Sequence, residues 1–538
     1  MKGEFSTPVS ISQINLDPKN KVWNSPIVFD DQIIYFLLVD RFNNGKTSST
    51  VRSNGAGFGE SNNLRNFCGG TIRGITRKLD YISSLGCTAI WISPVFENNH
   101  STYHGYAIQN FLRIDPRFGT LQQMKEMVKE AHNRGLSVYM DAVINHTGDN
   151  WYYKEGEHLK YNKGKKYQFG GWRDRYRPVP VELRSSELYY RCGQIINFDK
   201  YPETYHGDIY GLKTLLKDGS ESASKLLSLM VQIYCYWIAE TDIDGFRMDA
   251  VKHMDPEYVS RFTDAIKEYC KTIGKINFNI FAEIAAQDNV ISSYFHNKGS
   301  LDAALDFPLH FSIQKTFHEK SSPEYFKTRL KDRPSLLFVN FLDNHDQLGQ
   351  KPKRRFCNGL SLEQQKAGLA ILFAIPGIPC IYYGTEQGLQ GEGISDEFVR
   401  ECLFDPDGSA DLFDSSHPLF SEISRLCEIR KSYPGFGKGR LNVRTVSDNL
   451  VTKTESKICV FATNSDKGQF LLIFNPLNKK NIGFLLPDKK DGNKFILIYN
   501  NYIQNTATEY KVIAVEGIRT VTFELEPHQL IILKNSPE

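Results

Sequence analysis

The sequence lacks any apolar run long enough to cross a membrane. Its longest apolar stretch, residues 367–383, is interrupted by Pro376, Gly377 and Pro379, whereas a spanning helix needs about 20 predominantly apolar residues. The first 24 residues are polar and have no apolar centre of the kind found in signal peptides. We therefore expect a protein with no membrane partner that is cytoplasmic, or secreted if a signal peptide was removed before Met1.

A surplus of one charge is also missing. The 65 Lys and Arg residues are nearly balanced by 62 Asp and Glu residues, which leaves a net charge of +3. Proteins that bind nucleic acid derive much of their affinity from basic side chains that neutralise phosphates. The balance of charge therefore argues against a nucleic-acid partner.

The ten cysteines form no CxxC pair and show no spacing typical of a metal site. Several of them, such as Cys235, Cys380 and Cys459, lie inside apolar runs. Small apolar side chains of this kind are usually buried. We therefore expect free, buried cysteines and a reducing compartment.

The sequence does contain a long, regular alternation of apolar runs and amphipathic helical stretches, which is typical of α/β proteins with a parallel sheet. Its 538 residues, 41% of them hydrophobic, are enough for a (β/α)8 TIM barrel and a smaller companion domain. The eight predicted strands are residues 33–39, 89–92, 137–142, 245–249, 279–283, 303–307, 337–341 and 380–383.

Two regions depart from this alternation. About a hundred residues separate the third and fourth strands, and a structureless loop of that length is improbable in a compact domain. After about residue 438, short β-type runs alternate with polar turns, which is typical of an antiparallel β-sandwich. We predict a barrel at residues 28–146 and 207–436, an inserted domain at 147–206 after strand 3, and a C-terminal antiparallel β-sandwich domain at 437–538.

The segment GFRMDAVKH at residues 245–253 is the most informative part of the chain. In a strand, side chains two residues apart point to the same face, so Arg247 and Asp249 should lie about 7 Å apart along one face. A guanidinium that close lowers the pKa of a carboxyl group and keeps it ionised. Taken alone, the pair is either a structural salt bridge or a nucleophile with its partner.

Further carboxylates occur where other predicted strands end. The third strand runs into DAVINH at 141–146, the fifth ends at Glu283, and the seventh runs into DNHD at 343–346. Catalytic groups of (β/α)8 barrels lie at the carboxyl ends of the strands. Acidic side chains are rarely buried without a purpose, so this coincidence favours a catalytic site.

The blocks DAVINH (141–146), GFRMDAVKH (245–253), FAEI (281–284) and FLDNHD (341–346) resemble the four signature regions of the α-amylase family of glycoside hydrolases. Flanking blocks such as YHGYAIQNFLRIDPRFGT (103–120) and GIPCIYYGTEQGL (377–389) agree. The resemblance covers roughly residues 28–436, and the C-terminal region is similar to domain C of that family.

The resemblance implies Asp249 as nucleophile, Glu283 as general acid/base and Asp346 as a third carboxylate that grips substrate hydroxyls. This agrees with the residues themselves, because glycoside hydrolysis needs one ionised and one protonated carboxyl group. Adjacent parallel strands are about 4.8 Å apart, which suits the carboxyl separation of about 5–5.5 Å in retaining enzymes. The substrate-binding residues implied by the resemblance are Tyr106, His146, Arg247, Lys252, His253 and His345.

Calcium is the cofactor that the resemblance implies, since hard cations prefer oxygen ligands. Asn145, Asn197 and the main-chain oxygen of His253 would be its ligands, with asparagine at 197 where an aspartate is common in the family. The run DRFNN at 40–44 is either a second calcium loop or a simple turn rich in Asp and Asn.

We therefore predict a retaining endo-hydrolase of α-1,4-glucosidic bonds, with starch, glycogen or maltooligosaccharides as its α-glucan substrate. The Lys252–His253 pair resembles α-amylases and cyclodextrin-forming glucanotransferases. The alternatives are a 4-α-glucanotransferase or cyclodextrin/maltodextrin-active hydrolase with the same site, and a non-catalytic glucan-binding protein on the same fold. The lack of extra C-terminal domains found in large cyclodextrin-forming enzymes favours hydrolysis.

Overall fold

The structure is a computed structural model. It describes the chain except for residues 1–6, 49, 53–56, 59–63, 100–101, 174, 176, 296–300, 320–322, 451, 453, 488–491, 503–508, 516 and 537–538.

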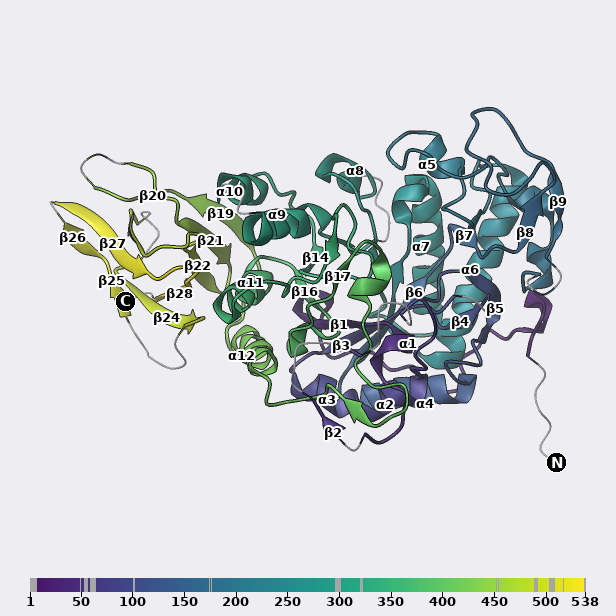
Figure 1. The fold of residues 1–538 in the computed structure, drawn as a ribbon, viewed down its shortest axis with the longest axis horizontal. Coiled ribbons are helices and arrows are strands. Elements are labelled where there is room, and N and C mark those ends of the chain that lie inside the picture. The colour runs from purple at the N-terminus through teal and green to yellow at the C-terminus, as the bar shows by residue number, and fades with distance from the viewer. Residues whose placement is uncertain are drawn as a thin grey trace.

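Eight parallel strands close into a barrel at the centre of the molecule (Figure 1), and each of them coincides with a predicted strand. Around the barrel the order is β1-β16-β14-β13-β12-β11-β6-β3, and β3 pairs with β1 to close it. The predicted TIM barrel is therefore confirmed. Its strands are β1 Ile34–Leu37, β3 Ala89–Ile92, β6 Ser137–Ala142, β11 Gly245–Met248, β12 Asn279–Ala282, β13 Ala303–Leu305, β14 Phe338–Phe341 and β16 Ile378–Tyr382.

Helices connect the strands and cover the outside of the barrel. Several begin with a side chain that caps the first turn, such as Ser220 before α6 and Asp255 before α7. Thr120 and Gln123 form a capping box at the start of α4. The α-helices are α1 Val39–Phe42, α2 Ile72–Arg77, α3 Leu79–Ser84, α4 Leu121–Asn133, α6 Glu221–Thr241, α7 Pro256–Thr272, α8 Asp288–Ser293, α9 Phe307–His318, α10 Pro323–Lys331, α11 Leu362–Ala374 and α12 Pro418–Ser432.

Close packing explains the glycine that begins β11. A Cβ atom at Gly245 would lie 2.2 Å from the carbonyl oxygen of Asn279 and 2.5 Å from the ring of Tyr139. Only a residue without a side chain lets β11 approach its neighbours this closely. The glycine thus fixes how β11 sits between β6 and β12.

The insert after β6 lies at one end of the long axis, as Figure 1 shows. It contains the hairpin of β8 Trp151–Tyr153 and β9 Phe169–Trp172 and the short helix α5 Glu203–His206. Strand β7 His146–Thr147 pairs with β10 Lys213–Thr214. This ladder extends the insert beyond the predicted boundary at residue 206, because β10 returns to the point where the insert leaves the barrel.

Two antiparallel sheets form the C-terminal region at the opposite end of the molecule (Figure 1). Leu471 and Ile531 from one sheet and Leu485 and Val521 from the other belong to a hydrophobic core separate from that of the barrel. The predicted antiparallel β-structure is therefore present. One sheet has the order β19 Arg440–Arg444, β21 Cys459–Ser465, β22 Gly468–Phe474, β28 Leu530–Ser536, β24 Lys494–Asn500 and β25 Glu509–Lys511, and the other β20 Val446–Ser447, β23 Asn481–Leu485, β27 Ile518–Leu525 and β26 Ile513–Val515.

Short strands complete the loops on the barrel. They are the hairpin β4 Phe96–Asn98 with β5 Ile108–Ile114, the antiparallel pair β15 Lys353–Arg354 with β17 Glu392–Gly393, and the parallel pair β2 Thr50–Val51 with β18 Ala410–Asp411.

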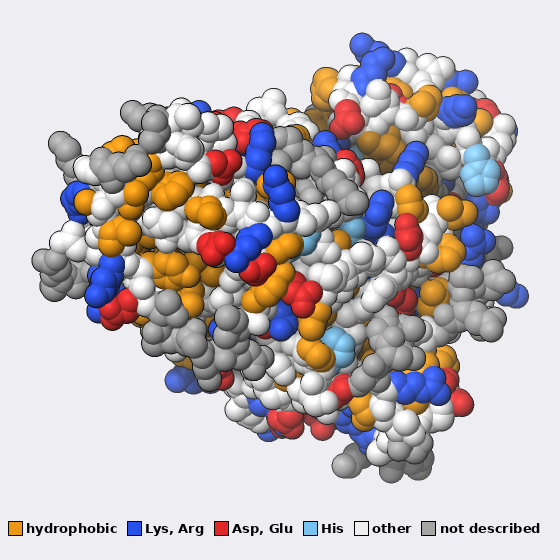
Figure 2. Space-filling model, turned by 60° about the vertical axis from the view of Figure 1, so that its left-hand side comes forward, with side chains coloured by type: hydrophobic (Ala, Val, Ile, Leu, Met, Phe, Trp, Pro, Cys, Tyr) orange, Lys and Arg blue, Asp and Glu red, His pale blue; other side chains and the backbone are white. Residues whose placement is uncertain are grey.

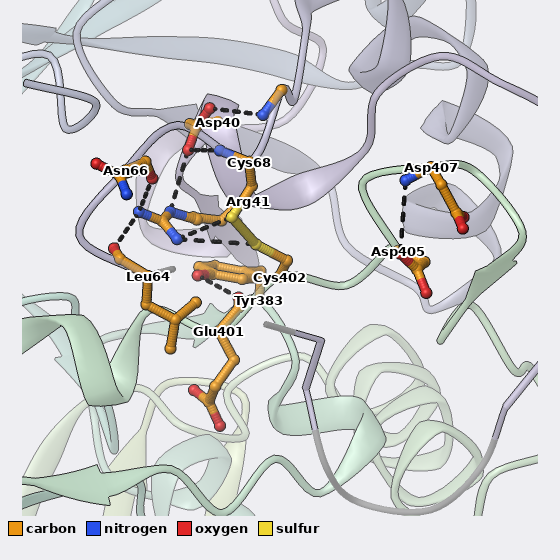
Figure 3. The surroundings of a disulfide bond; sticks show 11 residues. Asp40, Arg41, Leu64, Asn66, Cys68, Tyr383, Glu401, Cys402, Asp405 and Asp407 are labelled. Carbon is orange, nitrogen blue, oxygen red and sulfur yellow. Dashed lines mark hydrogen bonds and ion pairs between the residues drawn. A yellow bond between two sulfur atoms is a disulfide. The ribbon is translucent and has the colours of Figure 1, made fainter. Parts of the chain in front are cut away.

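The prediction that the cysteines are free is wrong for one pair. Cys68 and Cys402 form a disulfide across 334 residues of sequence, beside the buried guanidinium of Arg41 (Figure 3). Arg41 Nη2 donates to the carbonyls of Leu64 and Asn66, so the arginine and the disulfide together fasten this loop. Residues so far apart in sequence become neighbours only through folding of the barrel, which spacing alone does not reveal. The other eight cysteines are free.

Within the described residues, no helix combines the length and the apolar character needed to cross a membrane. Basic and acidic side chains are interspersed on the face that Figure 2 shows, without a large field of one sign. This agrees with the small net charge of +3.

Candidate active site

One arginine joins the acidic side chains at the carboxyl ends of three neighbouring strands. Arg247 on β11 is 1% exposed. Its Nη1 donates to Asp249 Oδ1 at 2.7 Å and also to Asp141 Oδ1, and its Nη2 lies 2.9 Å from Glu283 Oε2. β11 pairs with β6 on one side and with β12 on the other. Arg247 thus meets Asp249 on the same face, as predicted, and reaches both flanking strands as well.

Asp249 and Glu283 each have one oxygen anchored and one oxygen free. Glu283 Oε2 also accepts the main-chain N–H of Ala250 at 2.8 Å. Ala250 has a φ of 51°, a left-handed conformation that is unfavourable for alanine and typical of functional sites. Among the described residues, Asp249 Oδ2 and Glu283 Oε1 have no hydrogen-bond partner. One oxygen of each carboxyl group is therefore available to a ligand.

Burial raises the pKa of Asp249 and of Glu283 to about 7. Arg247 opposes this rise, but three carboxylates share its single positive charge, and the charge on each carboxylate raises the pKa of the others. Arg247 does lower the pKa of Asp249, as expected, but burial outweighs this effect. Interacting carboxyl groups titrate as a pair, so Asp249 and Glu283 together bind protons at a higher pH than ordinary carboxyl groups do.

A second arginine holds Asp346, which follows β14. Arg400 Nη2 lies 2.8 Å from Asp346 Oδ1, and Lys353 Nζ donates to the main-chain carbonyl of Asp346. Burial raises the pKa of Asp346, but His345 and Arg400 outweigh it and lower the pKa to about 2. Burial lowers the pKa of His345 to about 3, so His345 is neutral near pH 7. Near neutral pH, the cations that keep Asp346 ionised are therefore Arg400, Arg247 and Lys353.

The side chains of Tyr106 and three histidines lie next to one another beside these carboxylates. The ring of Tyr106 stacks on His345 at 5.3 Å and on His104 at 5.7 Å, and its hydroxyl donates to Asp141 Oδ2 at 3.1 Å. His146 Nε2 lies 3.2 Å from the main-chain oxygen of Tyr106. Burial lowers the pKa of His104 and of His146 to about 3, so these rings are neutral hydrogen-bonding groups. Tyr106 is 8% exposed, which leaves little of its ring for stacking on a sugar.

Lys252 and His253 lie in the short helix η6 (Val251–His253) and face the insert. Lys252 Nζ lies 2.5 Å from Asp199 Oδ1, and His253 Nδ1 lies 2.8 Å from the main-chain oxygen of Thr204 in α5. Burial lowers the pKa of His253 to about 4, so the imidazole donates to this carbonyl in its neutral form. The two residues therefore join the insert to the barrel directly after Asp249.

The insert carries one strongly exposed tyrosine. Tyr210 is 72% exposed, and its ring lies 5.9 Å from that of the partly buried Phe198. Partial burial raises the pKa of Tyr210, and so do the charges of Asp396 and Asp346. An aromatic ring open to solvent at this position can stack on the apolar face of a sugar.

The sequence reasoning did not identify five residues that the structure brings to this region. Asp141 carried a signal, because it ends a predicted strand and opens the DAVINH block. The others lie in segments without periodicity, where nothing local indicates their partners. They are Arg400, Lys353, Tyr210 and Lys217.

The residues expected to bind calcium do not fit such a site. Asn145 is buried and its Oδ1 has no hydrogen-bond partner, but its main-chain oxygen accepts Leu215 N at 3.0 Å and Lys217 Nζ at 3.5 Å. Asn197 is exposed and its Oδ1 accepts the N–H of Asp199 in a turn. The described part of the chain contains no group of three His, Cys, Asp or Glu residues that could hold a metal.

In the DRFNN run at residues 40–44, the carboxylate of Asp40 also makes contacts within the protein. Asp40 lies in α1, where its carboxylate accepts the N–H groups of Cys68 and Gly69 and lies 3.1 Å from Arg41 Nε (Figure 3). These contacts tie the loop that carries Cys68 to the barrel. The carboxylate of Asp40 is therefore already hydrogen-bonded and ion-paired within the protein.

Comparisons with known proteins agree with this geometry. Residues 36–403 match the family model described as "Alpha amylase, catalytic domain". The chain is 31% identical over 503 residues to a β/α-amylase of Paenibacillus polymyxa, covering 89% of this chain and 36% of that protein. It is 28% identical over 449 residues to an α-amylase of Streptomyces lividans, covering 71% of this chain and 48% of that protein. The chain thus spans about a third to a half of the length of these relatives.

Among solved structures, a cyclomaltodextrin glucanotransferase described as having a three-domain ABC distribution has a TM-score of 0.72 and 25% identity, covering 94% of this chain and 99% of that one. Further matches are named cyclomaltodextrin glucanotransferase, from Klebsiella oxytoca, and cyclomaltodextrinase, from Thermoanaerobacter pseudethanolicus. A glucanotransferase can therefore have three domains, so the number of domains does not separate hydrolases from glucanotransferases, contrary to our expectation. The match over residues 36–403 confirms the predicted family: this chain belongs to the α-amylase family of glycoside hydrolases and transferases.

Proposed function

We propose that the protein is a retaining endo-hydrolase of α-1,4-glucosidic bonds in starch, glycogen or maltodextrins. The observation that carries this proposal is the pair of Asp249 and Glu283, tied by Arg247 and each with one free oxygen. They follow adjacent parallel strands, which are about 4.8 Å apart. That spacing suits the separation of about 5–5.5 Å in retaining glycosidases, whereas inverting enzymes need about 6.5–9.5 Å.

The reaction proceeds in two displacements. Ionised Asp249 attacks the anomeric carbon while protonated Glu283 gives its proton to the glycosidic oxygen, so the bond to the leaving chain breaks as a glycosyl ester on Asp249 forms. Glu283, now ionised, then takes a proton from water, whose oxygen attacks the same carbon and releases Asp249. Two inversions retain the α configuration. The first step starts from the state in which the pair holds a single proton.

The surrounding side chains bind the sugar in this proposal. Asp346, kept ionised by the cations around it, accepts hydrogen bonds from hydroxyl groups of the unit that is cleaved. His146 and His345 are neutral and can exchange hydrogen bonds with further hydroxyls. Lys252, next to the insert, contacts the leaving part of the chain. No step requires a metal ion.

Rescue of two variants by azide would test the roles of the carboxyl groups. With an α-maltosyl fluoride substrate, Asp249→Gly leaves room for azide to attack the anomeric carbon directly, and the product should be the β-glycosyl azide. In Glu283→Gly, the ester on Asp249 still forms and azide opens it, so the product should be the α-glycosyl azide. If each variant gave the other product, the two roles would be reversed.

A second experiment, cleavage of amylose, addresses the non-catalytic alternative, a glucan-binding protein on this fold. The wild-type protein should release short α-maltooligosaccharides from amylose, and Asp249→Asn should abolish this release. Unchanged cleavage by Asp249→Asn would exclude this residue as the nucleophile. Absence of any cleavage by the wild type, together with retained amylose binding, would support the alternative.

A 4-α-glucanotransferase is the second candidate, because Tyr210 of the insert is an exposed ring within the electrostatic influence of Asp346. An aromatic surface that holds a second sugar raises the local concentration of that sugar relative to water. The glycosyl ester on Asp249 would then pass to a sugar hydroxyl instead of water. Products from maltoheptaose that are longer than the substrate, or cyclic, would support transfer.

The sequence left two compartments open, and the disulfide between Cys68 and Cys402 bears on this choice. Disulfides persist mainly in oxidising environments outside the cytoplasm. We therefore favour secretion over the cytoplasmic alternative. A thiol count on the denatured protein, isolated without reductant, would give eight free cysteines if the disulfide is formed.

A further inference from the structure

Lys217 is a buried lysine at the junction between the barrel and the insert. It follows β10 and precedes α6, and it is 7% exposed. Its Nζ donates to the main-chain oxygen of Leu215 at 2.9 Å and to that of Asn145 at 3.5 Å. Its own main-chain N–H donates to the hydroxyl of Tyr190 at 3.2 Å, and its Nζ lies 5.4 Å from the centre of that ring.

These contacts join three parts of the chain. Asn145 stands at the end of a barrel strand, Tyr190 belongs to the insert, and Leu215 leads the chain back to the barrel. The main-chain oxygen of Asn145 also accepts the N–H of Leu215, so both of its lone pairs are used. The ammonium group thus provides the cross-link that an ion bound to carbonyl oxygens would provide.

The charges around Lys217 disfavour the binding of a divalent cation. No carboxylate of the described residues lies within 4.0 Å of Nζ. The acidic residue that affects the pKa of Lys217 is Asp208. The carboxylate of Asp208 itself contacts Tyr153 Oη at 2.7 Å, Thr214 N at 3.0 Å and Lys213 Nζ at 3.8 Å. A calcium ion beside an ammonium group would bring two positive charges together without a carboxylate between them, which is unfavourable in a buried site.

Burial lowers the pKa of Lys217 to about 7, and the charge of Asp208 opposes this shift. Whether protonated or neutral, the amino group of Lys217 donates a hydrogen bond to the main-chain oxygen of Asn145, one of the residues named as calcium ligands by family resemblance. This oxygen, which would attract a cation, therefore already has a donor.

We propose that the ammonium group of Lys217 takes the structural place of a calcium ion, so that the protein holds the insert on the barrel without calcium. This inference is independent of the reaction proposed above. It replaces the calcium site that family resemblance predicted. The side-chain Oδ1 of Asn145, which is buried and has no hydrogen-bond partner, belongs to the same site, and removal of Lys217 would leave the main-chain oxygen of Asn145 with one donor fewer.

The test uses thermal unfolding and metal content. The wild-type protein, passed through a chelating column, should retain less than a tenth of an equivalent of calcium. Its midpoint of unfolding should be the same in EDTA as in millimolar calcium chloride, because only a ligand that binds the folded state raises that midpoint. One equivalent of tightly held calcium, or a midpoint that falls by several degrees in EDTA and recovers with calcium, would overturn the proposal.

A variant separates the ammonium group from the rest of the side chain. Lys217→Met keeps the length of the side chain and removes the charge and the hydrogen bonds, so the midpoint should fall by several degrees. Lys225→Met is the matched control, since Lys225 is 74% exposed and pairs only with Glu221 on the surface of α6; its midpoint should not change. A Lys217→Met protein as stable as the wild type would also overturn the proposal. If Lys217→Met fails to fold, the calcium measurements on the wild type still decide.

Discussion

Arg400 Nη2 and Asp346 Oδ1 lie 2.8 Å apart, although 54 residues separate them in the sequence. This arginine serves one catalytic carboxylate, whereas Arg247 is shared by Asp141, Asp249 and Glu283. Burial raises the pKa of both Asp346 and Asp249. His345 and Arg400 outweigh it at Asp346 and lower the pKa to about 2, whereas the shared Arg247 does not outweigh it at Asp249, whose pKa is raised to about 7. The two arginines thus separate an ionised carboxylate from a pair of carboxyl groups with a raised pKa.

Replacing Arg400 should move the acid limb of the pH–activity profile. In the wild type, Asp346 is ionised down to about pH 2, so it does not limit activity in the acid range. In Arg400→Met, burial acts without one of the charges that oppose it, so the pKa of Asp346 rises and activity is lost at a higher pH. We expect kcat/KM at neutral pH to fall by about 10- to 100-fold, which corresponds to about 1.4–2.8 kcal/mol.

The conservative variant Arg400→Lys is the control for this prediction. Its ammonium group keeps a positive charge near Asp346, although it lacks the planar fork of arginine. Its acid limb should therefore stay close to that of the wild type even if kcat/KM falls. Arg400 also contacts His345 and Tyr103 through hydrogen bonds, so an equal loss at every pH in both variants would assign it only a structural role.

Neutralising one carboxyl group of the catalytic pair should stabilise the protein while it abolishes activity. Asp249→Asn removes one of three negative charges around Arg247 and leaves Asp141 and Glu283 to pair with it. The pKa of Asp249 is raised by burial from 3.8 to about 7. The folded wild type therefore binds more protons than the unfolded chain between these values, and its stability falls as pH rises through this window.

The advantage of Asp249→Asn over the wild type should therefore be small near about pH 4 and should reach its full size above about pH 7. We expect its midpoint of unfolding to exceed that of the wild type by a few degrees on the alkaline side. Glu268→Gln, at a carboxylate that is 70% exposed, is the control and should show no such pH dependence. A midpoint lower than that of the wild type at every pH would contradict the prediction.

Gly245→Ala should destabilise the barrel. The new methyl group would lie 2.2 Å from the carbonyl oxygen of Asn279 and 2.5 Å from the ring of Tyr139, so β11 would have to move away from its neighbours. Overpacking of this kind costs about 1–3 kcal/mol, and occasionally more. Gly211→Ala is a matched control, because the nearest atom to its new methyl group, Asp149 Cβ, is 3.9 Å away. Denaturant unfolding of both variants would measure the difference, and equal stabilities would refute this account of Gly245.

The sequence predicted those features that depend on local pattern and on strand order. All eight barrel strands were recognisable, because strands buried on both faces are apolar and alternate with helices. Asp249 and Glu283 were recognisable because the ends of parallel strands meet at one edge. The partner of Asp346 was not, because Arg400 follows the short helix η8 (Asp396–Val399) in a region without periodicity. How many carboxylates share Arg247 depends on packing between three strands, which no single segment reveals.

The same limit applies to the insert. Its existence followed from the long interval between two strands, but its contacts with the barrel did not. Lys217 and the Cys68–Cys402 disulfide depend on segments that meet only in the folded chain. Asn197 was placed by resemblance at a metal site, whereas in the structure its side chain serves a local turn.

Tyr210→Ala should change the fate of the glycosyl group more than the rate of its formation. The ring of Tyr210 is 72% exposed, and the charges of Asp346 and Asp396 influence the pKa of its hydroxyl, so we expect it to hold an acceptor sugar without contacting the catalytic pair. Removal of a stacking ring costs about 1 kcal/mol in binding of that sugar, and each 1.4 kcal/mol is a factor of ten. We expect the ratio of transfer to hydrolysis with maltoheptaose to fall about five- to tenfold, while the initial release of the leaving group changes less.

Tyr325→Ala, at a ring on α10 that is 45% exposed, is the control and should leave this ratio unchanged. An unchanged ratio in Tyr210→Ala would exclude Tyr210 as an acceptor-binding residue and would weaken the glucanotransferase alternative, because that alternative rests on this aromatic surface.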